Sequence, residues 1–446
     1  MFFDIAQFYN HTSLEKAYEQ NIAPLPTEYK DFKRNRSEFS KWFVENNKKR
    51  IIDYCLTDCK FTLELSNLWV KLFHDVFGVY VNRWLSSGYL AEKVIITHNV
   101  HIPLFNSIPC EIQDLAYRSY YGGRFEMLIR GFIGEGYLYD INSAYPHALT
   151  KLPDLDNGEW VNGTRIHPKA EIGFFKIEAT VPIENYITPF PLRTYNGINK
   201  LLIFPSGNFI TTCTLHELIA CENPDYYKIL DSWQFIPKTN YYPLKDFIEV
   251  NYNKRLELKN ADNPAQLPIK IILNSIYGKT GQARHGMGNL FNPVIFAFTT
   301  GFTRGQMYKF VRDSNLNKEV VSFATDSLCV TKNLNLPAIK ELGMFSLANS
   351  AYDVFMLQNG YYRFNGIWKS RGFGKDAGKL VENIGIKEID GRLYLVLQET
   401  RSTRLRTAIV ENRIRDIRKI QPYEKKINLN ADRKRHWLTR LESVNS

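Results

Sequence analysis

Two aspartates that end short apolar runs could together hold divalent metal ions. Asp140 closes the alternating run "GYLYD". Asp326 lies in the small, polar turn 324–327, and the apolar runs 320–323 and 328–330 on either side of it predict the two strands of a hairpin. Carboxylate oxygens are the ligands that hard cations such as Mg²⁺ prefer. An aspartate in either place is also ordinary turn or cap chemistry, so the metal-site hypothesis depends on the pair.

A second set of side chains could bind phosphate. The runs "KRLELK" and "KIILNSIYGK" predict two helices joined by a loop near Asn263 and Pro264. Spacings of three and four residues put polar side chains on one face of each helix, and such a basic face suits a nucleoside triphosphate. Taken alone, each helix is better interpreted as a solvated basic face beside a core tyrosine. The side chains in question are Arg255, Lys259, Lys270, Asn274 and Tyr277.

The remaining elements must position these groups. Helical patterns cover residues 12–20, 51–75 and 294–312, while strands and loops with frequent Pro and Gly alternate from about 152 to 242. The tail from about residue 401 reads as basic helix mixed with loop. Helical patterns and strand patterns therefore both occur along the chain.

Composition narrows the class of protein. The 446 residues are 44% hydrophobic, and the six cysteines are scattered without a CxxC pair, which favours a reducing compartment over a disulfide framework or a zinc site. We find no membrane-spanning run and no signal peptide, so we expect an intracellular protein without a membrane partner. The net charge is +11, and the segment 401–446 holds 13 Lys or Arg against five Asp or Glu. That balance indicates a polyanionic partner, with a solvated helical face that has no partner as the alternative.

Five motifs in order resemble one known family. "DINSAYP", "KIILNSIYG" and "FATDS" resemble motifs A, B and C of family B DNA polymerases. "YYGGRFE" resembles the YxGG motif of the protein-primed branch found in phages, adenoviruses and linear plasmids, and "DYCLTD" resembles the third exonuclease motif. About 130 residues between Asp140 and Lys270 leave room for the first terminal-protein-region insertion of that branch.

The resemblance implies an α+β chain with the right-hand polymerase fold of palm, fingers and thumb and with an antiparallel palm sheet. It also implies a partial exonuclease-domain remnant, because the first two exonuclease motifs should precede "FFDIAQFYN". It predicts the following division: an incomplete exonuclease-like domain at 1–80, palm at 81–151, the insertion at 152–242, fingers at 243–283, palm again at 284–400, and thumb at 401–446.

Residue by residue, the resemblance implies these roles. Asp140 and Asp326 are the catalytic metal ligands, with the Ile141 carbonyl as a further ligand of two Mg²⁺ or Mn²⁺ ions. Tyr145 matches the steric gate that excludes a ribose 2′-hydroxyl, and Arg255, Lys259, Lys270, Asn274 and Tyr277 contact the incoming nucleotide. The expected DNA contacts are Tyr121, Gly122, Gly123, Arg124, Ser143, Thr325, Ser327, Tyr361, Lys369 and Arg371.

The sequence departs from the family pattern in four places. Ala324 replaces the first aspartate of motif C, which predicts a higher metal requirement and not inactivity. Asp58 is the one exonuclease-motif acid found, so we expect no 3′→5′ exonuclease. Only 13 residues separate Gly278 from Asn292, where the branch has its second, longer insertion. We therefore do not expect processive strand displacement or strict protein priming from this chain. In the Lys-x-Tyr motif, asparagine stands at the lysine position of Asn359-Gly360-Tyr361, and Lys369 and Arg371 are its expected substitutes.

These observations predict a template-directed DNA polymerase of a viral or mobile-element genome, in the cytoplasm of a microbial or virus-infected host. Its expected partners are a DNA template-primer and dNTPs, with a terminal protein and a separate exonuclease subunit as further candidates. The alternative is a catalytically inactive polymerase-like subunit that binds nucleic acid or a partner protein.

Overall fold

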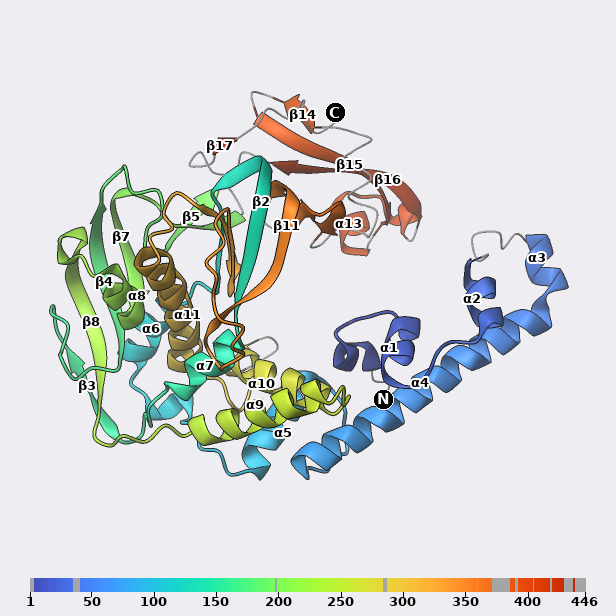
Figure 1. Cartoon of the computed structure of the whole chain (residues 1–446), viewed down its shortest axis with the longest axis horizontal. Coiled ribbons are helices and arrows are strands. Elements are labelled where there is room, and N and C mark those ends of the chain that lie inside the picture. Colours follow the sequence, from blue (N-terminus) through green and yellow to red (C-terminus); the bar gives the residue numbers. More distant parts are fainter. Residues whose placement is uncertain are drawn as a thin grey trace. The chain divides into compact units, whose positions relative to one another are not determined.

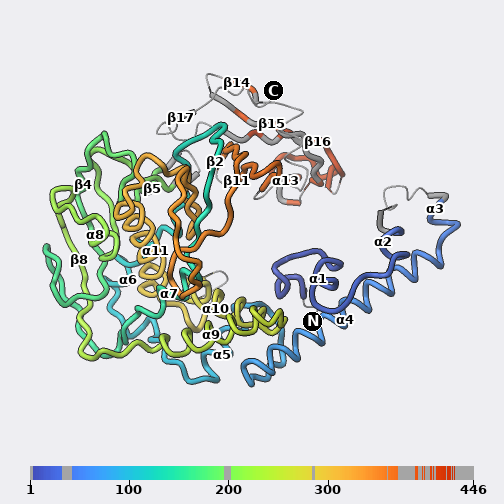
Figure 2. The backbone as a smooth tube through the Cα atoms, viewed as in Figure 1, coloured from blue at the N-terminus to red at the C-terminus, as the bar shows by residue number. Residues whose placement is uncertain are grey.

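The computed structural model describes residues 4–34, 41–196, 199–283, 287–358, 360–370, 386–389, 392–403, 405–417, 419–428 and 436–437 (Figure 2). The chain divides into two compact units, each made of three separate segments. Unit 1 comprises Met1–Tyr120, Ser143–Lys176 and Ile229–Thr300, and unit 2 comprises Tyr121–Asn142, Ile177–Lys228 and Gly301–Ser446. Asp140 and Asp326 therefore belong to unit 2, and the basic face belongs to unit 1.

Unit 1 is mainly helical. Its N-terminal helices confirm the helical patterns predicted at 12–20 and 51–75, and the Ser13 side chain caps the first of these by accepting from the Lys16 N–H. The helices are η1 (Ile5–Tyr9), α1 (Leu14–Asn21), α2 (Thr27–Arg34), α3 (Lys41–Asn46), α4 (Lys48–Phe77), α5 (Ser87–Thr97), η3 (Phe105–Ser107), α6 (Cys110–Arg118), α7 (Ala144–Thr150), α9 (Lys245–Asn260) and α10 (Gln266–Thr280).

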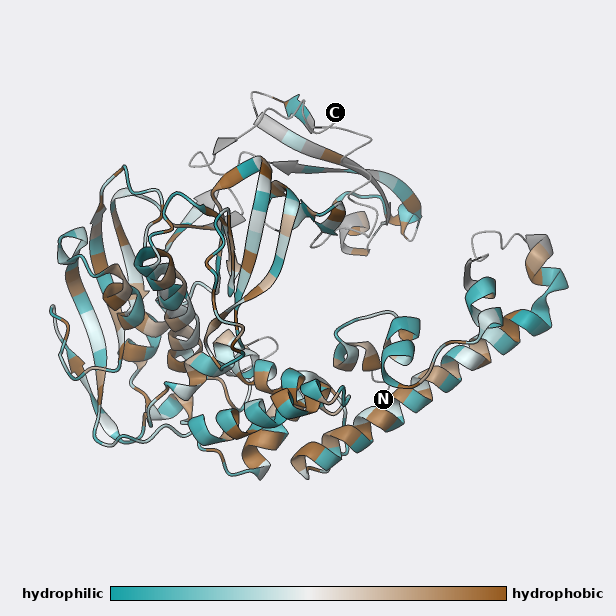
Figure 3. Cartoon of the chain, in the orientation of Figure 1, coloured by the Kyte–Doolittle hydropathy of each residue, from teal (hydrophilic) through white to brown (hydrophobic). Residues whose placement is uncertain are grey.

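The long helix α4 buries one apolar stripe. Every fourth residue from Phe61 to Phe77 is buried, which places these side chains along a single face. The Phe8 ring from η1 stacks on Trp69 with a centroid separation of 4.9 Å. Figure 3 shows the same mixture of apolar and polar residues along α4. The spacing of the apolar residues therefore determines which face of this helix is buried.

Helices α9 and α10 form the predicted pair around Asn263 and Pro264 and lie side by side (Figures 1 and 2). The Asn263 side chain accepts from the Ala265 N–H at 2.9 Å and holds the turn. Helix α10 also packs on α5, where Lys279 and Glu92 form a nearly buried ion pair at 2.7 Å. The two helices that carry the predicted nucleotide contacts are therefore fixed to the rest of unit 1.

An antiparallel sheet carries Asp140 and Asp326 in unit 2. Its strand order is β1-β9-β10-β2-β11-β12-β13, and β17 (His436–Trp437) adds a short parallel pairing with β2. The long strands β2 and β11 run alongside each other in Figure 1. The strands are β1 (Arg124–Met127), β2 (Ile129–Ile141), β9 (Val320–Thr325), β10 (Ser327–Val330), β11 (Phe345–Gln358), β12 (Tyr361–Phe364) and β13 (Ile367–Ser370). The antiparallel sheet and the motif C hairpin expected from the sequence are confirmed.

The region predicted to be rich in strands holds two smaller sheets. One has the order β3-β8-β4-β7, and the other is the hairpin β5-β6. Helix α8 (Leu215–Cys221) follows β7, and the long helix α11 (Pro293–Asp313) confirms the helical pattern at 294–312. The bounds are β3 (Gly158–Asn162), β4 (Ile172–Val181), β5 (Leu192–Asn196), β6 (Asn199–Ile203), β7 (Gly207–Thr214), η4 (Pro224–Tyr226) and β8 (Tyr227–Pro237).

The C-terminal part differs from the expected mixture of basic helix and loop. Its described residues form the antiparallel sheet β14 (Ile386–Ile389), β15 (Arg392–Ser402) and β16 (Ile420–Asn428), besides the short helices α13 (Leu405–Val410) and η5 (Ile414–Asp416). Pairing of β16 along β15 overrides the local helix preference of its Lys and Glu residues. Among the described residues, every helix is too short or too polar to span a bilayer.

Candidate active site

Asp140 sits in a row of side chains that crosses the sheet of unit 2. It pairs directly with Ser327 on β10 and with Ser346 on β11, and Ser327 pairs in turn with Ala324 on β9. Residues directly opposite each other on antiparallel strands share one face of the sheet. Asp140 is therefore flanked by two serines, and Ala324 lies two strands away from it.

Asp326 is held beside this row by backbone hydrogen bonds. Its carbonyl accepts from the Ile141 N–H at 3.0 Å, and its own N–H donates to the Ala324 carbonyl at 3.0 Å. Thr325 has a left-handed φ of 69°, which is costly for a β-branched residue and makes the tight turn between β9 and β10. The two aspartates predicted as a pair are thus brought together within unit 2.

The electrostatics of this pair fit a cation. Burial raises the pKa of Asp326, and the neighbouring Asp140 carboxylate raises it further. Burial also raises the pKa of Asp140, while the Ser327 hydroxyl, which donates to Asp140 Oδ1, acts in the opposite direction. Two half-buried carboxylates that repel each other form a donor set that a divalent cation would stabilise.

The YxGG segment packs directly behind motif C. A Cβ on Gly123 would lie 2.7 Å from Thr325 Cγ2, so only glycine fits there. Gly122 has a φ of 78°, and its carbonyl accepts from Arg304. The Tyr121 hydroxyl lies 3.0 Å from the hydroxyls of Thr211 and Thr212. These three residues are therefore in place to support the Asp326 turn.

Two residues expected to contact DNA are buried instead. Arg124 is 0% exposed: its guanidinium donates to Glu126 and to the Thr188 carbonyl, and lies over the rings of Phe204 and Phe323. Tyr361 is 2% exposed and packs on Trp368. The predictions of DNA contacts for both side chains are wrong, because their positions in β1 and β12 direct them into the protein interior.

Sequence reasoning missed Tyr362, the next residue along β12. Alternation along a strand puts Tyr362 and Tyr361 on opposite faces. Tyr362 lines a cavity of about 320 Å³ together with Ala324, Ser327 and the exposed Lys369. Burial raises the pKa of Tyr362, and the Cys329 and Asp140 groups raise it further. The signal in the sequence was the pair of consecutive tyrosines, because the tyrosine of the Lys-x-Tyr motif can be aligned with Tyr362 as well as with Tyr361. Arg371 lies outside the described residues.

The basic face predicted on α9 and α10 exists within unit 1. Burial lowers the pKa of Lys270, and the positive charges of Arg255 and Lys259 lower it further. Burial also lowers the pKa of Arg255, whose Nη1 donates to Ser143 Oγ at 3.4 Å while its Nε is buried without a hydrogen-bond partner in the described part of the chain. None of these three cations forms an ion pair with a carboxylate among the described residues. Three clustered cations that pair with no carboxylate in the described part of the chain would suit a polyanionic ligand.

Aromatic residues adjoin that basic face. The Tyr145 and Tyr277 rings lie 4.4 Å apart at an angle of 39°, and the Tyr277 hydroxyl is 3.2 Å from that of Tyr120. Asn274 is exposed one turn before Tyr277. Ser143, which begins the turn into α7, has a left-handed φ of 50°. The motif B residues therefore lie together on one side of unit 1, as their helical spacing predicted.

Most of the chain matches the sequence pattern of one known protein family. The family of type B DNA polymerases of organelles and viruses matches residues 5–292. The chain belongs to this family. The predicted resemblance to protein-primed family B polymerases is thereby confirmed.

Individual type B polymerases extend the match. The DNA polymerase of Acidianus bottle-shaped virus is 28% identical over 428 residues, which cover 88% of this chain and 63% of the viral protein. The DNA-directed DNA polymerase of Enterobacteria phage PRD1 is 28% identical over 244 residues, covering 53% of this chain and 39% of the phage protein. A probable DNA polymerase of Ascobolus immersus is 26% identical over 265 residues, 56% of this chain and 20% of the fungal protein. The chain thus spans less than two thirds of the length of these relatives.

Solved structures show that the type B polymerase fold is shared. Phi29 DNA polymerase in a ternary complex with primer-template DNA and nucleotide superimposes with a TM-score of 0.59 at 15% identity, covering 85% of this chain and 72% of that one. Its orthorhombic crystal form gives 0.57 at 16% identity, covering 87% and 69%. The right-hand polymerase fold predicted from the motifs is therefore confirmed.

Proposed function

We propose that this chain is a template-directed DNA polymerase that adds deoxynucleotides to a primer 3′-hydroxyl. The observation that carries the proposal is the adjoining, half-buried pair Asp140, near the end of β2, and Asp326, in the turn between β9 and β10, in a chain of this family. We infer that the pair holds two Mg²⁺ or Mn²⁺ ions, with the Ile141 carbonyl as a further ligand. When bound, such ions stabilise negative charge on the attacking and leaving oxygens of phosphoryl transfer.

The protein's own groups orient the reactants in this proposal. The Ser327 hydroxyl fixes the Asp140 carboxylate, and the strained turn at Thr325 fixes Asp326. Lys270, Arg255 and Lys259 hold the triphosphate of a dNTP, because they form a cationic group without a carboxylate partner among the described residues. The Tyr145 ring, packed on Tyr277, excludes a ribose 2′-hydroxyl, and Asn274 adds a polar contact.

DNA contacts follow from the remaining sequence expectations. Gly122, Gly123, Thr325 and Ser327 would approach the template-primer near the carboxylates, with Tyr121 behind them. Lys369 and Tyr362 line the cavity beside Ala324 and would hold the primer end, and Ser143 would contact DNA near α7. We also propose the six-part domain division given above, replication of a viral or mobile-element genome, and a terminal protein or a separate exonuclease subunit as further partners.

We further propose that this chain by itself does not proofread. The Asp58 carboxylate accepts a hydrogen bond from the Tyr29 hydroxyl. Among the described residues, the one group of three acidic, His or Cys side chains close enough to hold a metal does not include Asp58. Degradation of single-stranded DNA that disappears in an Asp58→Ala variant would contradict this.

Primer extension tests the proposed polymerase. The full chain, Asp140→Asn, Asp326→Asn and the control Asp225→Asn, an exposed carboxylate of unit 2, are compared with a DNA primer-template and Mg²⁺ or Mn²⁺. We expect the first two substitutions to lower the extension rate at least about 100-fold, since metal-assisted charge stabilisation is worth several kcal/mol. Asp225→Asn should have no effect.

The alternative is a polymerase-like subunit that binds nucleic acid without catalysis, and Ala324 is the observation that favours it. It predicts DNA binding without extension under every metal condition. Extension by the parent chain that Asp140→Asn abolishes would exclude it. Absence of extension with both metals would overturn the polymerase proposal.

A further inference from the structure

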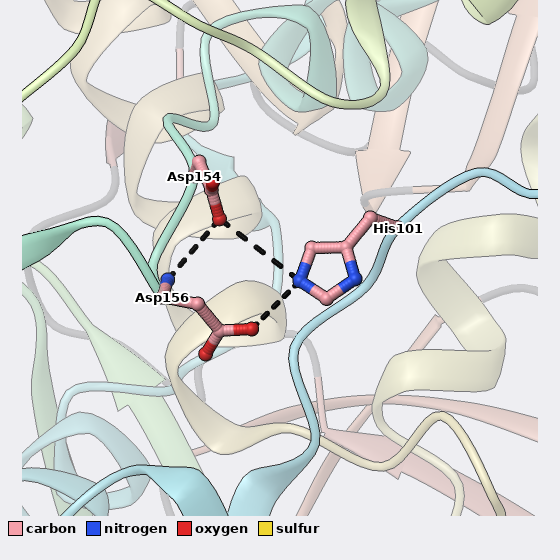
Figure 4. A group of neighbouring side chains, drawn as sticks. All are labelled: His101, Asp154 and Asp156. Carbon is pink, nitrogen blue, oxygen red and sulfur yellow. Dashed lines mark hydrogen bonds and ion pairs between the residues drawn. The ribbon is translucent and has the colours of Figure 1, made fainter.

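A histidine and two aspartates converge in unit 1, away from the groups assigned above. His101 lies in the segment between α5 and η3, and Asp154 and Asp156 lie in the loop between α7 and β3 (Figure 4). His101 Nε2 is 2.6 Å from Asp156 Oδ2 and 4.0 Å from Asp154 Oδ1. One ligand atom from each side chain lies within 4.8 Å of the other two. We propose that these three residues bind a first-row transition metal ion of the Zn²⁺ type.

The loop side of the site is fixed before any ion binds. Leu155 is 6% exposed, and its burial anchors the loop. Asp154 and Asp156, on either side of Leu155, both face His101 (Figure 4). The Asp154 N–H donates to the Tyr241 carbonyl at 3.1 Å, and the Lys238 N–H donates to the Asn157 carbonyl at 3.0 Å. Binding therefore requires little ordering of the backbone, which favours affinity.

The histidine side is fixed as well. Ile102, next to His101, is 8% exposed, and the Pro103 carbonyl accepts from Asn292 Nδ2 at 3.0 Å. Ser107 Oγ lies 2.8 Å from the Leu104 carbonyl oxygen and 3.3 Å from Asp156 Oδ1, so its one proton serves both acceptors. The other Asp156 oxygen faces the imidazole. Outer hydrogen bonds of this kind commonly orient metal ligands.

The donor chemistry selects the class of ion. Bonds of about 2.0–2.2 Å from zinc to imidazole nitrogen and carboxylate oxygen keep all donors of one ion within about 4.4 Å of each other. Asp154 Oδ1, 4.0 Å from His101 Nε2, lies within that range, whereas Asp156 Oδ2, hydrogen-bonded to the imidazole at 2.6 Å, would move away slightly to admit the ion. An imidazole among the donors favours Zn²⁺ and ions of similar preference, such as Ni²⁺, over Mg²⁺, Ca²⁺ and Mn²⁺, which prefer oxygen donors. Three protein ligands leave at least one position for water, in keeping with the 49% exposure of the His101 side chain.

A bound ion would join two segments that are about 50 residues apart in the sequence. It would tie the chain before η3 to the loop that follows α7, both within unit 1. Because the ion binds the folded state only, it would raise the melting temperature of the protein as its concentration rises. The proposal does not depend on polymerase activity.

The test uses the full chain with Asp140→Asn and Asp326→Asn, because these two substitutions remove the proposed polymerase metal site and leave the His101 site to be measured. Metal-free protein is titrated with Co²⁺, whose visible absorption reports coordination by the protein, and then with Zn²⁺ in competition. We expect one equivalent of Co²⁺ to bind, Zn²⁺ to displace it, and His101→Gln or Asp154→Asn to weaken binding at least tenfold. Asp154→Asn keeps an oxygen acceptor for the Asp156 N–H and so preserves the turn.

The matched control is His74→Gln. His74 faces a single carboxylate, Asp75, at 3.8 Å, and its loss should leave Co²⁺ binding unchanged. In a chain that also carries Cys55→Ser, Cys59→Ser and Cys110→Ser, which remove the exposed thiols, His101→Cys should restore binding with a thiolate-to-cobalt band in the near ultraviolet that His101→Gln lacks. No saturable Co²⁺ absorption, or binding that survives His101→Gln, would overturn the proposal and leave a simple histidine–carboxylate ion pair.

Discussion

At the scale of single residues, the two tyrosines of β12 have separate tasks. Tyr361 is buried against Trp368, whereas Tyr362 lines the cavity beside Ala324 and Ser327. The alternation of side chains along a strand requires this division, because consecutive residues point to opposite faces. A substitution at each position should therefore affect a different property of the protein.

We predict that Tyr362→Leu raises the KM for primer-template about tenfold with little change in stability, since it removes a contact worth about 1.4 kcal/mol. Tyr361→Ala should instead destabilise the fold by about 3–5 kcal/mol, as for other large buried rings. Steady-state primer extension and urea unfolding of both variants check this. A larger KM effect from Tyr361 than from Tyr362 would contradict the assignment.

Ala324 also belongs to the residue scale. It lies two strands from Asp140, so an aspartate here would add negative charge near the carboxylate pair without contacting Asp140 directly. We predict that Ala324→Asp lowers the Mg²⁺ concentration for half-maximal extension about tenfold, because affinity for a hard cation rises with ligand charge. Ala324→Asn, equal in shape but neutral, is the control and should leave the metal requirement unchanged.

At the scale of elements, α11 approaches the start of α8 unusually closely. A Cβ on Gly301 would lie 2.2 Å from Thr214 Cγ2, and one on Gly305 would lie 2.6 Å from the His216 carbonyl oxygen. Between them Arg304, 1% exposed, donates from Nε to Glu217 at 2.7 Å and from Nη1 to the Gly122 carbonyl. The Arg304 side chain therefore connects α8 and α11 to the YxGG segment, which in turn packs on the turn that holds Asp326.

We predict that Gly301→Ala destabilises the protein by about 1–3 kcal/mol, the usual cost of overpacking. Gly278→Ala in α10 is the matched control: its Cβ meets nothing within 4 Å, so it should stabilise the helix by about 0.5–1 kcal/mol. Denaturant unfolding of both variants measures the difference. Equal effects would show that the α8–α11 approach is adaptable.

Helix α8 also carries a buried histidine. Burial lowers the pKa of His216 to about 4, so the ring stays neutral in the folded protein while the unfolded chain takes up a proton near pH 6.5. Unfolding therefore binds a proton between pH 6.5 and 4, and stability must fall as the pH falls through this window. The shift corresponds to at most about 3 kcal/mol.

We predict that His216→Leu removes most of this pH dependence. The free energy of unfolding, measured in urea at pH 7 and pH 4.5, should decrease less in the variant than in the parent protein. Each protein's value at pH 7 serves as its own reference, which separates the proton linkage from any change in packing. Parallel losses in the two proteins would show that other groups dominate acid destabilisation.

At the scale of the whole molecule, the net charge of +11 favours a polyanion. Contacts to DNA phosphates release counterions, so affinity should fall steeply as salt rises. We predict that Lys369→Gln reduces the slope of log affinity against log salt by about one unit, the value for one lost phosphate contact. Lys309→Gln is the control, because Lys309 already pairs with Asp313. Titrations of fluorescent primer-template at several salt concentrations measure both slopes, and equal slopes for Lys369→Gln and the parent chain would exclude Lys369 as a phosphate ligand.

Local patterns predicted much of the fold and part of the candidate site. The apolar stripe of α4, the paired helices around Asn263, and the hairpin at Asp326 each follow from spacing within one segment. The faces carrying Lys270 and Tyr277 were correct for the same reason. The C-terminal strands β15 and β16 were missed, because strand pairing between distant segments overrode the helix preference of their residues.

By itself, the sequence determined the order of the motifs, the identity of the metal-binding carboxylates to be tested, and the helices that carry the cations. Only the tertiary structure decided that Arg124 is buried, that Tyr362 rather than Tyr361 lines the cavity beside Ala324 and Ser327, and that His101 meets Asp154. The physical reason is that helical and strand periodicity are local, whereas burial and register depend on contacts between segments far apart in the chain.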